Sequence, residues 1–162
     1  MKPKLIQTST GNYYCEEDPG EKGYKNNPQR LSVTEQEAEI LGRLVAGLRV
    51  VEIGTGLGVS TRAMAETAIE VVSVDVDSWA HQFDFPDNVK LVQDIPLSRF
   101  DFAFIDGSHK YQHILADINI VNAPILVIHD CYIVEVKRAI EDSGIVEVEK
   151  FVTACDMRMF KK

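Results

Sequence analysis

A short apolar run meets three alternating glycines in residues 50–61, which read VVEIGTGLGVST. The β-branched residues at the start of the run lack the polar alternation of a half-exposed strand, so they predict a strand buried in a parallel sheet. Glycines just past the end of that strand remove the Cβ atoms that would keep a ligand away from the backbone. Ser60 and Thr61 then open a helical stretch. The pattern predicts a strand, a ligand-binding turn and a helix start.

The spacing of the glycines discriminates between ligands. A dinucleotide fingerprint needs a third small residue, and Val59 stands at that position. The string Glu-x-Gly-x-Gly-x-Gly resembles instead the first motif of the class I S-adenosylmethionine-dependent methyltransferases. The resemblance implies cofactor contacts from Glu52, Gly54, Thr55, Gly56 and Gly58. A tight turn without a ligand is the alternative that this stretch alone leaves open.

Length and charge bound the class of protein. A chain of 162 residues with 45% hydrophobic content fits one globular domain with a core of its own. The net charge of −8 disfavours a nucleic-acid partner, because binding of phosphates needs clustered Lys and Arg, and only short pairs such as Lys137-Arg138 occur. A small-molecule substrate is therefore expected. A homo-oligomer is left open.

The cysteines and the absence of long apolar runs indicate the compartment. The three cysteines, Cys15, Cys131 and Cys155, are odd in number and lack metal-type or redox spacing, so we expect them to be reduced and the protein to be cytoplasmic. No apolar run approaches the length of a membrane-spanning helix, and no membrane partner is expected.

The first part of the chain differs in composition from the rest. Residues 7–30 are polar, carry repeated Gly, Pro and Asn breakers, and predict a loop. Tyr13, Tyr14 and Tyr24 could stack over a substrate, and a mobile N-terminus is the alternative. We divide the chain into an N-terminal lid or flexible segment, residues 1–33, and a methyltransferase domain, residues 34–162.

Strand and helix patterns alternate through the second part. Thr34 and Glu37 form a capping-box pattern that predicts a helix start. Strands are predicted at residues 70–75, 89–94, 100–106 and 125–130, and helices at residues 61–67, 111–118 and 134–143. Asp77-Ser78 predicts the N-cap of a short helix. Residues 146–152 and 155–160 predict a terminal strand pair.

Aspartates end all four of the strands predicted between residues 70 and 130. Asp75 lies about twenty residues beyond the glycine turn, where an open α/β sheet presents a carboxylate to ribose hydroxyls. Its neighbour Val76 is placed beside the cofactor as well. In the resemblance Asp94 takes the adenine amino group, although an Asp before Ile95-Pro96 is equally a turn initiator.

The string Asp106-Gly107-Ser108-His109-Lys110-Tyr111 follows the strand predicted at residues 100–106. It resembles the class I methyltransferases that act on hydroxyls of small molecules, including sugar and antibiotic O-methyltransferases. The resemblance implies His109 as general base, and the ordinary pKa of imidazole suits that role. A structural histidine at the start of the next helix is the alternative.

Asp106 and Asp130, at the ends of two strands, are candidate ligands for Mg²⁺ or another divalent metal that binds substrate oxygens. The family commonly has an acidic residue before the second aspartate, and this chain has His129. Because imidazole is a poor ligand for Mg²⁺ and a good one for Zn²⁺, Mn²⁺ or Fe²⁺, either the metal differs or the two aspartates only orient substrate. His129 is thus a candidate metal ligand.

The sequence therefore predicts an α/β, doubly wound, Rossmann-like domain with a seven-stranded, mostly parallel sheet, an antiparallel last strand and helices on both faces. The expected activity is S-adenosylmethionine-dependent methylation of a hydroxylated small-molecule acceptor. A cofactor-binding but catalytically silent regulatory or interaction protein is the alternative. A nucleotide-dependent oxidoreductase is disfavoured by Val59, and an Asn-Pro-Pro-aromatic type of nucleic-acid or amine methyltransferase by the absence of that tetrapeptide.

Overall fold

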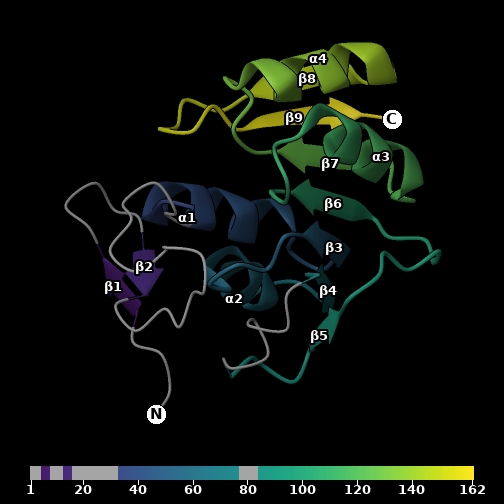
Figure 1. Ribbon diagram of the computed structural model, residues 1–162. Coiled ribbons are helices and arrows are strands. Elements are labelled where there is room, and N and C mark those ends of the chain that lie inside the picture. The colour runs from purple at the N-terminus through teal and green to yellow at the C-terminus, as the bar shows by residue number, and fades with distance from the viewer. Residues whose placement is uncertain (1–4, 8–12, 16–32, 77–83) are drawn as a thin grey trace.

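A computed structural model describes residues 5–7, 13–15, 33–76 and 84–162, and within them a seven-stranded sheet forms the centre of the molecule (Figure 1). Its strands, in spatial order, are β5 (Val89–Val92), β4 (Glu70–Val74), β3 (Arg49–Ile53), β6 (Phe102–Ile105), β7 (Ile125–Ile128), β9 (Arg158–Lys161) and β8 (Val146–Lys150). The helices are α1 (Glu35–Leu44), α2 (Val59–Ala65), α3 (Tyr111–Ile120) and α4 (Val134–Ser143). All pairs from β5 to β7 are parallel, and β9 is antiparallel to both of its neighbours. The predicted fold class is confirmed.

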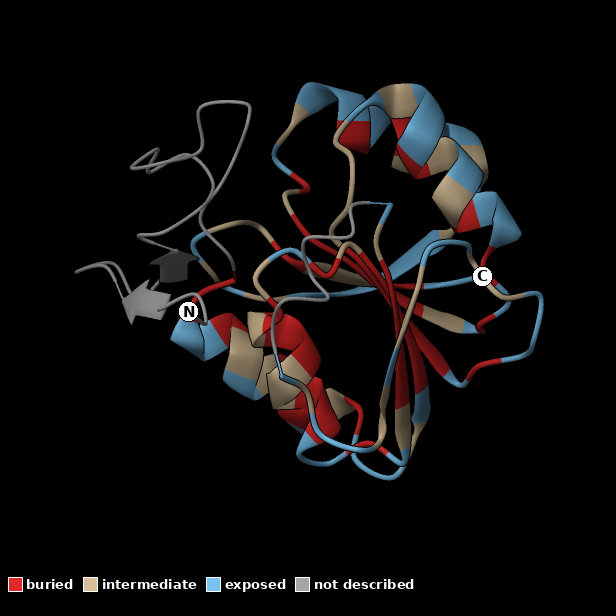
Figure 2. Cartoon of the chain, turned by 60° about the horizontal axis from the view of Figure 1, so that its bottom comes forward, coloured by how far each residue is buried: buried red, intermediate tan, exposed pale blue. Residues whose placement is uncertain are grey.

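Helices cover both faces of the sheet, and successive strand residues alternate between the two cores. On one face Val50, Phe102 and Phe104 pack with α1 and α2 residues such as Leu41 and Met64. On the other face a second cluster gathers around α3 and α4; its strand members include Val51, Ala103 and Ile105 and its helix members Ile114 and Val136. Figure 2 shows the buried strands between these layers. Burial on both faces explains why these strands read as unbroken apolar runs.

The order of the strands positions the site. Along the chain, β4 and β5 are added on one side of β3, whereas β6 and β7 are added on the other. In open parallel sheets a ligand binds at the carboxyl ends of the strands where the order reverses, which here lies between β3 and β6. Gly54 follows β3 and Asp106 follows β6. Both predicted motifs therefore meet at the switch point.

The sequence signals mark the start of α1 and the end of α4, whereas α2 begins and ends two residues before the predicted 61–67. The Thr34 side chain accepts from the Glu37 backbone N–H and the Glu37 side chain accepts from the Thr34 N–H, which confirms the capping box at α1. Helix α4 spans the predicted residues and ends at Gly144, whose φ of 74° is left-handed.

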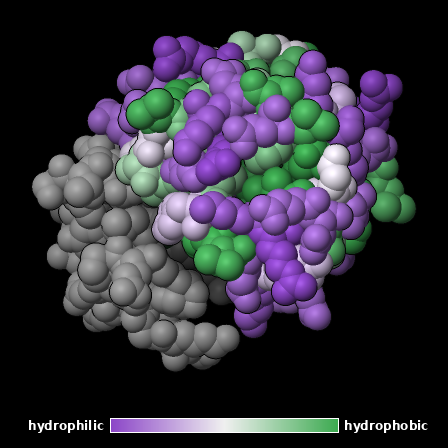
Figure 3. Space-filling view, turned by 90° about the horizontal axis from the view of Figure 1, so that it is seen from above, coloured by the Kyte–Doolittle hydropathy of each residue, from purple (hydrophilic) through white to green (hydrophobic). Residues whose placement is uncertain are grey.

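The α4 and β8 end of the molecule carries mostly hydrophilic side chains with separate apolar patches (Figure 3). Strand β8 is the edge of the sheet, and all five of its residues are exposed. Its two glutamates and its lysine give this edge the charged character that opposes edge-to-edge aggregation.

The N-terminal part contains a two-stranded antiparallel sheet of β1 (Leu5–Gln7) and β2 (Tyr13–Cys15). The prediction of a loop over residues 7–30 is wrong for Tyr13–Cys15, because β-prone aromatic residues pair there over a length too short to show periodicity. Tyr24 and most of the predicted lid, together with the Asp77-Ser78 helix start, lie outside the described residues. In the described part, no helix has the length and apolar character needed to cross a membrane.

Candidate functional site

The turn after β3 depends on its glycines. Gly54, Gly56 and Gly58 have φ values of 97°, 48° and 71°, a region that residues with a Cβ atom rarely adopt. At Gly54 a Cβ atom would overlap the backbone carbonyl of Asp106 and the Cα of Gly107. The ends of β3 and β6 can therefore approach each other only because Gly54 has no side chain.

Asp75 holds the same turn from the neighbouring strand. Its Oδ2 accepts hydrogen bonds from the backbone N–H groups of Thr55 at 3.1 Å and Gly56 at 3.0 Å. The Thr55 hydroxyl is hydrogen-bonded to Ser73 on β4 at 2.7 Å. The acid predicted to bind ribose thus also fixes the shape of the glycine turn.

Glu52 lies behind the turn and is fully buried. Three hydroxyls donate to its carboxylate at 2.5 Å: Ser60 to Oε1, and Thr61 and Ser73 to Oε2. Burial raises the pKa of Glu52 to about 7, although the three hydrogen bonds oppose the shift. Its carboxylate therefore ties β3, β4 and the start of α2 together inside the protein.

A cavity of about 1040 Å³ opens at the carboxyl ends of β3, β4 and β6. Seven of the residues predicted for the site line it, namely Gly54, Asp75, Val76, Asp94, Asp106, His109 and Asp130. Five others, Glu52, Thr55, Gly56, Gly58 and His129, do not line the cavity. The predicted set is therefore split between side chains that face the cavity and residues that shape its wall.

Four side chains converge at the ends of β6 and β7. His109 Nε2 lies 3.0 Å from Asp130 Oδ2 and 3.9 Å from Asp106 Oδ1. His129 Nδ1 lies 3.2 Å from Asp130 Oδ2 and 3.3 Å from Asp106 Oδ1. Asp130 has a φ of 55°, and this left-handed backbone conformation places its carboxylate between the two imidazoles.

The carboxylates and imidazoles change one another's pKa. The neighbouring Asp106 and Asp130 raise the pKa of His109 to about 9, against the opposing effect of burial. Burial disfavours a charged His129, but the same two carboxylates outweigh it and raise the pKa of His129. Burial would raise the pKa of Asp106 and Asp130, and the two histidines bring both below their usual range.

A cation would fit among these groups. Asp106, His129 and Asp130 each offer one ligand atom, and these atoms lie within 4.8 Å of one another. His129 is only 4% exposed, and neither of its buried ring nitrogens, nor His109 Nε2, has an aligned hydrogen-bond partner among the described residues. A solvent-shielded nitrogen that faces two carboxylates without such a bond matches the donor set of a divalent ion.

Glu37 on α1 reaches the same cluster from the opposite side of His129. Its Oε2 lies 3.3 Å from His129 Nε2, and both side chains are buried. Sequence reasoning assigned Glu37 to the capping box alone. Glu37 and His129 are far apart in the sequence, so no local pattern predicts this contact, which depends on how α1 packs on the sheet.

Two titratable residues of α3 were also missed. His113 and Asp117 line the cavity one helical turn apart, and burial raises the pKa of Asp117 to about 6. The His113 ring is hydrogen-bonded to the Ser108 hydroxyl at 2.9 Å. A helical face through His113 and Asp117, next to the face of the buried Ile114 and Ile118, is the signal that could have identified them.

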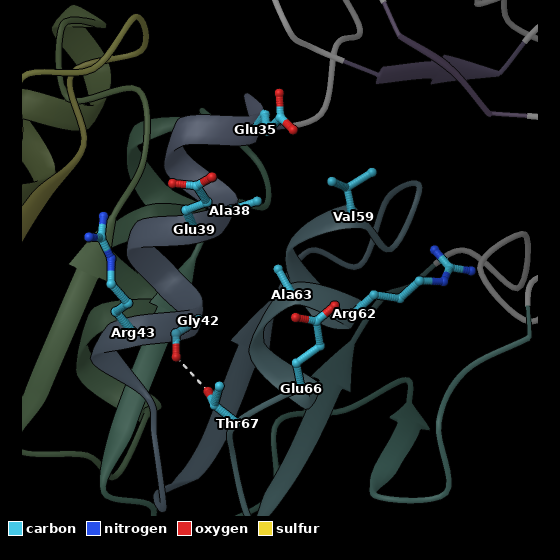
Figure 4. A pocket seen from close by; sticks show the side chains of 10 residues that line it. All are labelled: Glu35, Ala38, Glu39, Gly42, Arg43, Val59, Arg62, Ala63, Glu66 and Thr67. Atoms are coloured by element: carbon cyan, nitrogen blue, oxygen red, sulfur yellow. Dashed lines mark hydrogen bonds between the residues drawn. The ribbon is translucent and has the colours of Figure 1, made fainter.

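A second hollow, of about 590 Å³, lies between α1 and α2 (Figure 4). The helices come together where the Thr67 hydroxyl donates to the Gly42 carbonyl at 2.5 Å, and they diverge toward Glu35 and Val59. The ten residues drawn there include no histidine or cysteine. The first cavity, which His109 and four aspartates of the predicted set line, is therefore the candidate site.

Comparison with known proteins identifies the fold. A protein of Pyrococcus horikoshii assigned as an RNA methyltransferase superposes with a TM-score of 0.63 and 22% identity, over 78% of this chain and 84% of that one. The 1,6-didemethyltoxoflavin-N1-methyltransferase of Burkholderia thailandensis, solved with bound 1,6-didemethyltoxoflavin and S-adenosylhomocysteine, gives 0.58 and 17% over 79% and 77%. A protein of Klebsiella pneumoniae assigned as an O-methyltransferase gives 0.58 and 17% over 80% and 80%.

These structural neighbours are class I methyltransferases, and the chain shares their Rossmann-like fold. Their descriptions name RNA, nitrogen and oxygen as the target of methylation, so the shared fold does not identify the methyl acceptor of this protein. No family model matches the sequence, and neither does any curated protein.

Proposed function

We propose that this protein is an S-adenosylmethionine-dependent methyltransferase that methylates a hydroxyl of a small molecule. One observation carries the proposal: the glycine turn held by Asp75 and the cluster of Asp106, His109 and Asp130 border the same cavity at the switch point of the sheet. This arrangement supports a donor site next to a proton-accepting group.

The cavity suits the methyl donor in shape and charge. The glycine turn at Gly54 offers open backbone to the amino-acid tail, Asp75 and Val76 are assigned to the ribose, and Asp94 to the adenine. A carboxylate such as that of Asp75 can accept hydrogen bonds from ribose hydroxyls. Carboxylates along the wall also favour a ligand that carries a sulfonium cation.

Methyl transfer to oxygen requires an in-line approach and removal of a proton. The bond from sulfur to the methyl carbon breaks as the acceptor oxygen forms its bond to that carbon, and the hydroxyl proton passes to the His109 imidazole. Asp106 helps to orient the His109 ring. With the pKa of His109 raised to about 9, its base role requires that positive charge offset Asp106 and Asp130.

We assign that positive charge to a divalent metal ion. Asp106 Oδ1, Asp130 Oδ2 and His129 Nδ1 would hold it, as the orphaned His129 nitrogen supports. When bound, such an ion lowers the pKa of a coordinated hydroxyl. Its positive charge would also offset the two carboxylates and so lower the pKa of His109.

The charges around the site favour a small acceptor over RNA. Asp75, Asp94, Asp106, Asp117 and Asp130 all line the cavity. The chain carries a net charge of −8, and the sugar-phosphate backbone of RNA would be repelled by the aspartates around this cavity. We further propose a cytoplasmic location, which the unpaired thiols of Cys131 and Cys155 support.

A methyl-transfer assay tests the proposal. The purified protein would be incubated with methyl-labelled S-adenosylmethionine, Mg²⁺ or Mn²⁺, and pools of sugars, phenols and other hydroxylated compounds, with the His109→Gln variant as control. We expect label in a product of the wild type, and a rate 10²- to 10⁴-fold lower in the variant. Cofactor binding without transfer to any pool would favour the silent regulatory alternative, and transfer to RNA alone would contradict the acceptor class.

A further inference from the structure

We propose that Glu37 is a positioning residue that fixes His129 as a nitrogen ligand, so that the centre takes a transition-series divalent cation, such as Mn²⁺ or Co²⁺, in preference to Mg²⁺. The inference rests on the divalent-ion site of the proposed function. It adds to that site a residue from α1 and a class of metal.

The Glu37 carboxylate is itself held rigidly. Its Oε2 accepts from the Thr34 N–H at 2.8 Å and from the Thr34 hydroxyl at 3.0 Å. Its Oε1 accepts from the Cys155 N–H, in the segment before β9, at 3.2 Å. Donors from both ends of the domain thus fix a carboxylate that has no exposed surface.

The His129 ring lies between Glu37 and the two aspartates. Nε2 faces Glu37 Oε2 at 3.3 Å, while Nδ1 faces Asp106 and Asp130 at 3.3 and 3.2 Å. The ring packs edge-on against Phe104, with the ring centroids 6.2 Å apart. It is therefore fixed by packing as well as by charge.

This arrangement is the one that orients an imidazole toward a metal. Ligating histidines usually direct their second ring nitrogen to a carboxylate, which keeps the proton on that nitrogen and leaves the first nitrogen free to bind. Glu37 supplies that carboxylate on the Nε2 side. His129 Nδ1, on the other side, is the nitrogen directed at the metal position.

The donor set then determines the class of metal. Mg²⁺ prefers oxygen ligands and retained waters, whereas an imidazole nitrogen combined with carboxylates suits Mn²⁺, Co²⁺, Fe²⁺ or Zn²⁺. Glu37, Asp106 and Asp130 surround His129 with three carboxylates, so a divalent cation also offsets their charge. The alternative is that no metal binds and that protons on the histidines offset the charge of the three carboxylates.

Calorimetric titration of the full-length, metal-free protein with Mn²⁺, Co²⁺ and Mg²⁺ tests the inference. We expect the wild type to bind Mn²⁺ at least tenfold more tightly than Mg²⁺. Glu37→Gln should weaken Mn²⁺ binding 10- to 100-fold, the range typical for loss of an outer carboxylate. Glu39→Gln is the matched control, because it removes the same charge from an exposed position of α1; its Mn²⁺ affinity should stay within twofold of wild type.

A second variant and a second readout separate the possible failures. His129→Asn keeps the Glu37 capping bonds, and it should remove the Mn²⁺ preference and change the visible absorption of the Co²⁺ form. The inference is overturned if Glu37→Gln binds Mn²⁺ as tightly as the wild type does. If Glu37→Gln does not fold, the same result for His129→Asn overturns it. A preference of the wild type for Mg²⁺ over Mn²⁺ overturns it as well. S-adenosylhomocysteine is titrated into the same samples: binding of it without any metal binding overturns the inference alone, and lack of binding by the wild type overturns the proposed function.

Discussion

Gly54 and Asp106 meet backbone to backbone, so the turn after β3 and the loop after β6 form one surface. A Cβ atom on Gly54 would overlap the Asp106 carbonyl oxygen, and Gly54 has a φ of 97°. This contact therefore couples the position of the glycine turn to that of Asp106. A side chain added at Gly54 would displace the backbone of Asp106.

Gly54→Ala should disturb both sites. The overlap adds about 1–3 kcal/mol to the strain of a left-handed residue, which is itself about 1–2 kcal/mol. Gly56→Ala is the matched control, because Gly56 also has a positive φ but has nothing within 4 Å of the added atom. Urea denaturation and S-adenosylhomocysteine titration should show the larger loss for Gly54→Ala, and equal losses would argue against the contact.

Asp75 and His109 should affect different steps. Asp75→Ala removes a carboxylate that holds two backbone N–H groups and is assigned to ribose, so we expect cofactor affinity to fall about 10- to 100-fold. His109→Ala should leave cofactor affinity near wild type and abolish most methyl transfer. Calorimetry and single-turnover assays measure the two effects. The same loss of binding in both variants would refute this division of roles.

Glu52 should make stability depend on pH. Burial raises its pKa from 4.5 to about 7, so the folded protein binds a proton that the unfolded chain releases between these values. The free energy of unfolding should therefore fall as pH rises from 4.5 to 7, by about 3 kcal/mol, and change little from this source above 7. Glu52→Gln should remove this slope. Parallel slopes for the two proteins in urea titrations at several pH values would show that Glu52 is not the group responsible.

Asp130 combines a carboxylate with a left-handed backbone, and two substitutions separate these features. Asn tolerates a φ of 55° better than Ala does, so Asp130→Asn should be more stable than Asp130→Ala by about 1 kcal/mol. Both changes remove the charge that faces His109 and His129, and both should lower methyl transfer strongly. A thermal-unfolding midpoint for Asp130→Ala equal to that of Asp130→Asn would show that the backbone there is not strained.

Local signals in the sequence were sufficient for most of the fold. Glycines and apolar runs marked the turn after β3 and the buried strands, and the capping box and Gly144 marked helix ends. These features act over a few residues, so their physical causes can be read from neighbours in the chain. The pairing of Tyr13–Cys15 with β1 was missed because three residues give too little periodicity.

Long-range contacts in the site could not be predicted in the same way. The Glu37 carboxylate looked like an ordinary helix cap, yet it faces His129 across the packing of α1 on the sheet. Glu52 was assigned to the cofactor, and the structure surrounds it with three hydroxyls that no motif connects. The roles of both acids depend on which segments fold together.

Calorimetric titration with S-adenosylhomocysteine is the decisive test of the proposal that the cavity at the switch point binds S-adenosylmethionine. We predict micromolar binding to the wild type and much weaker binding to Asp75→Ala. Absence of binding to the wild type, with and without a divalent metal, would contradict the account from the glycine turn onward.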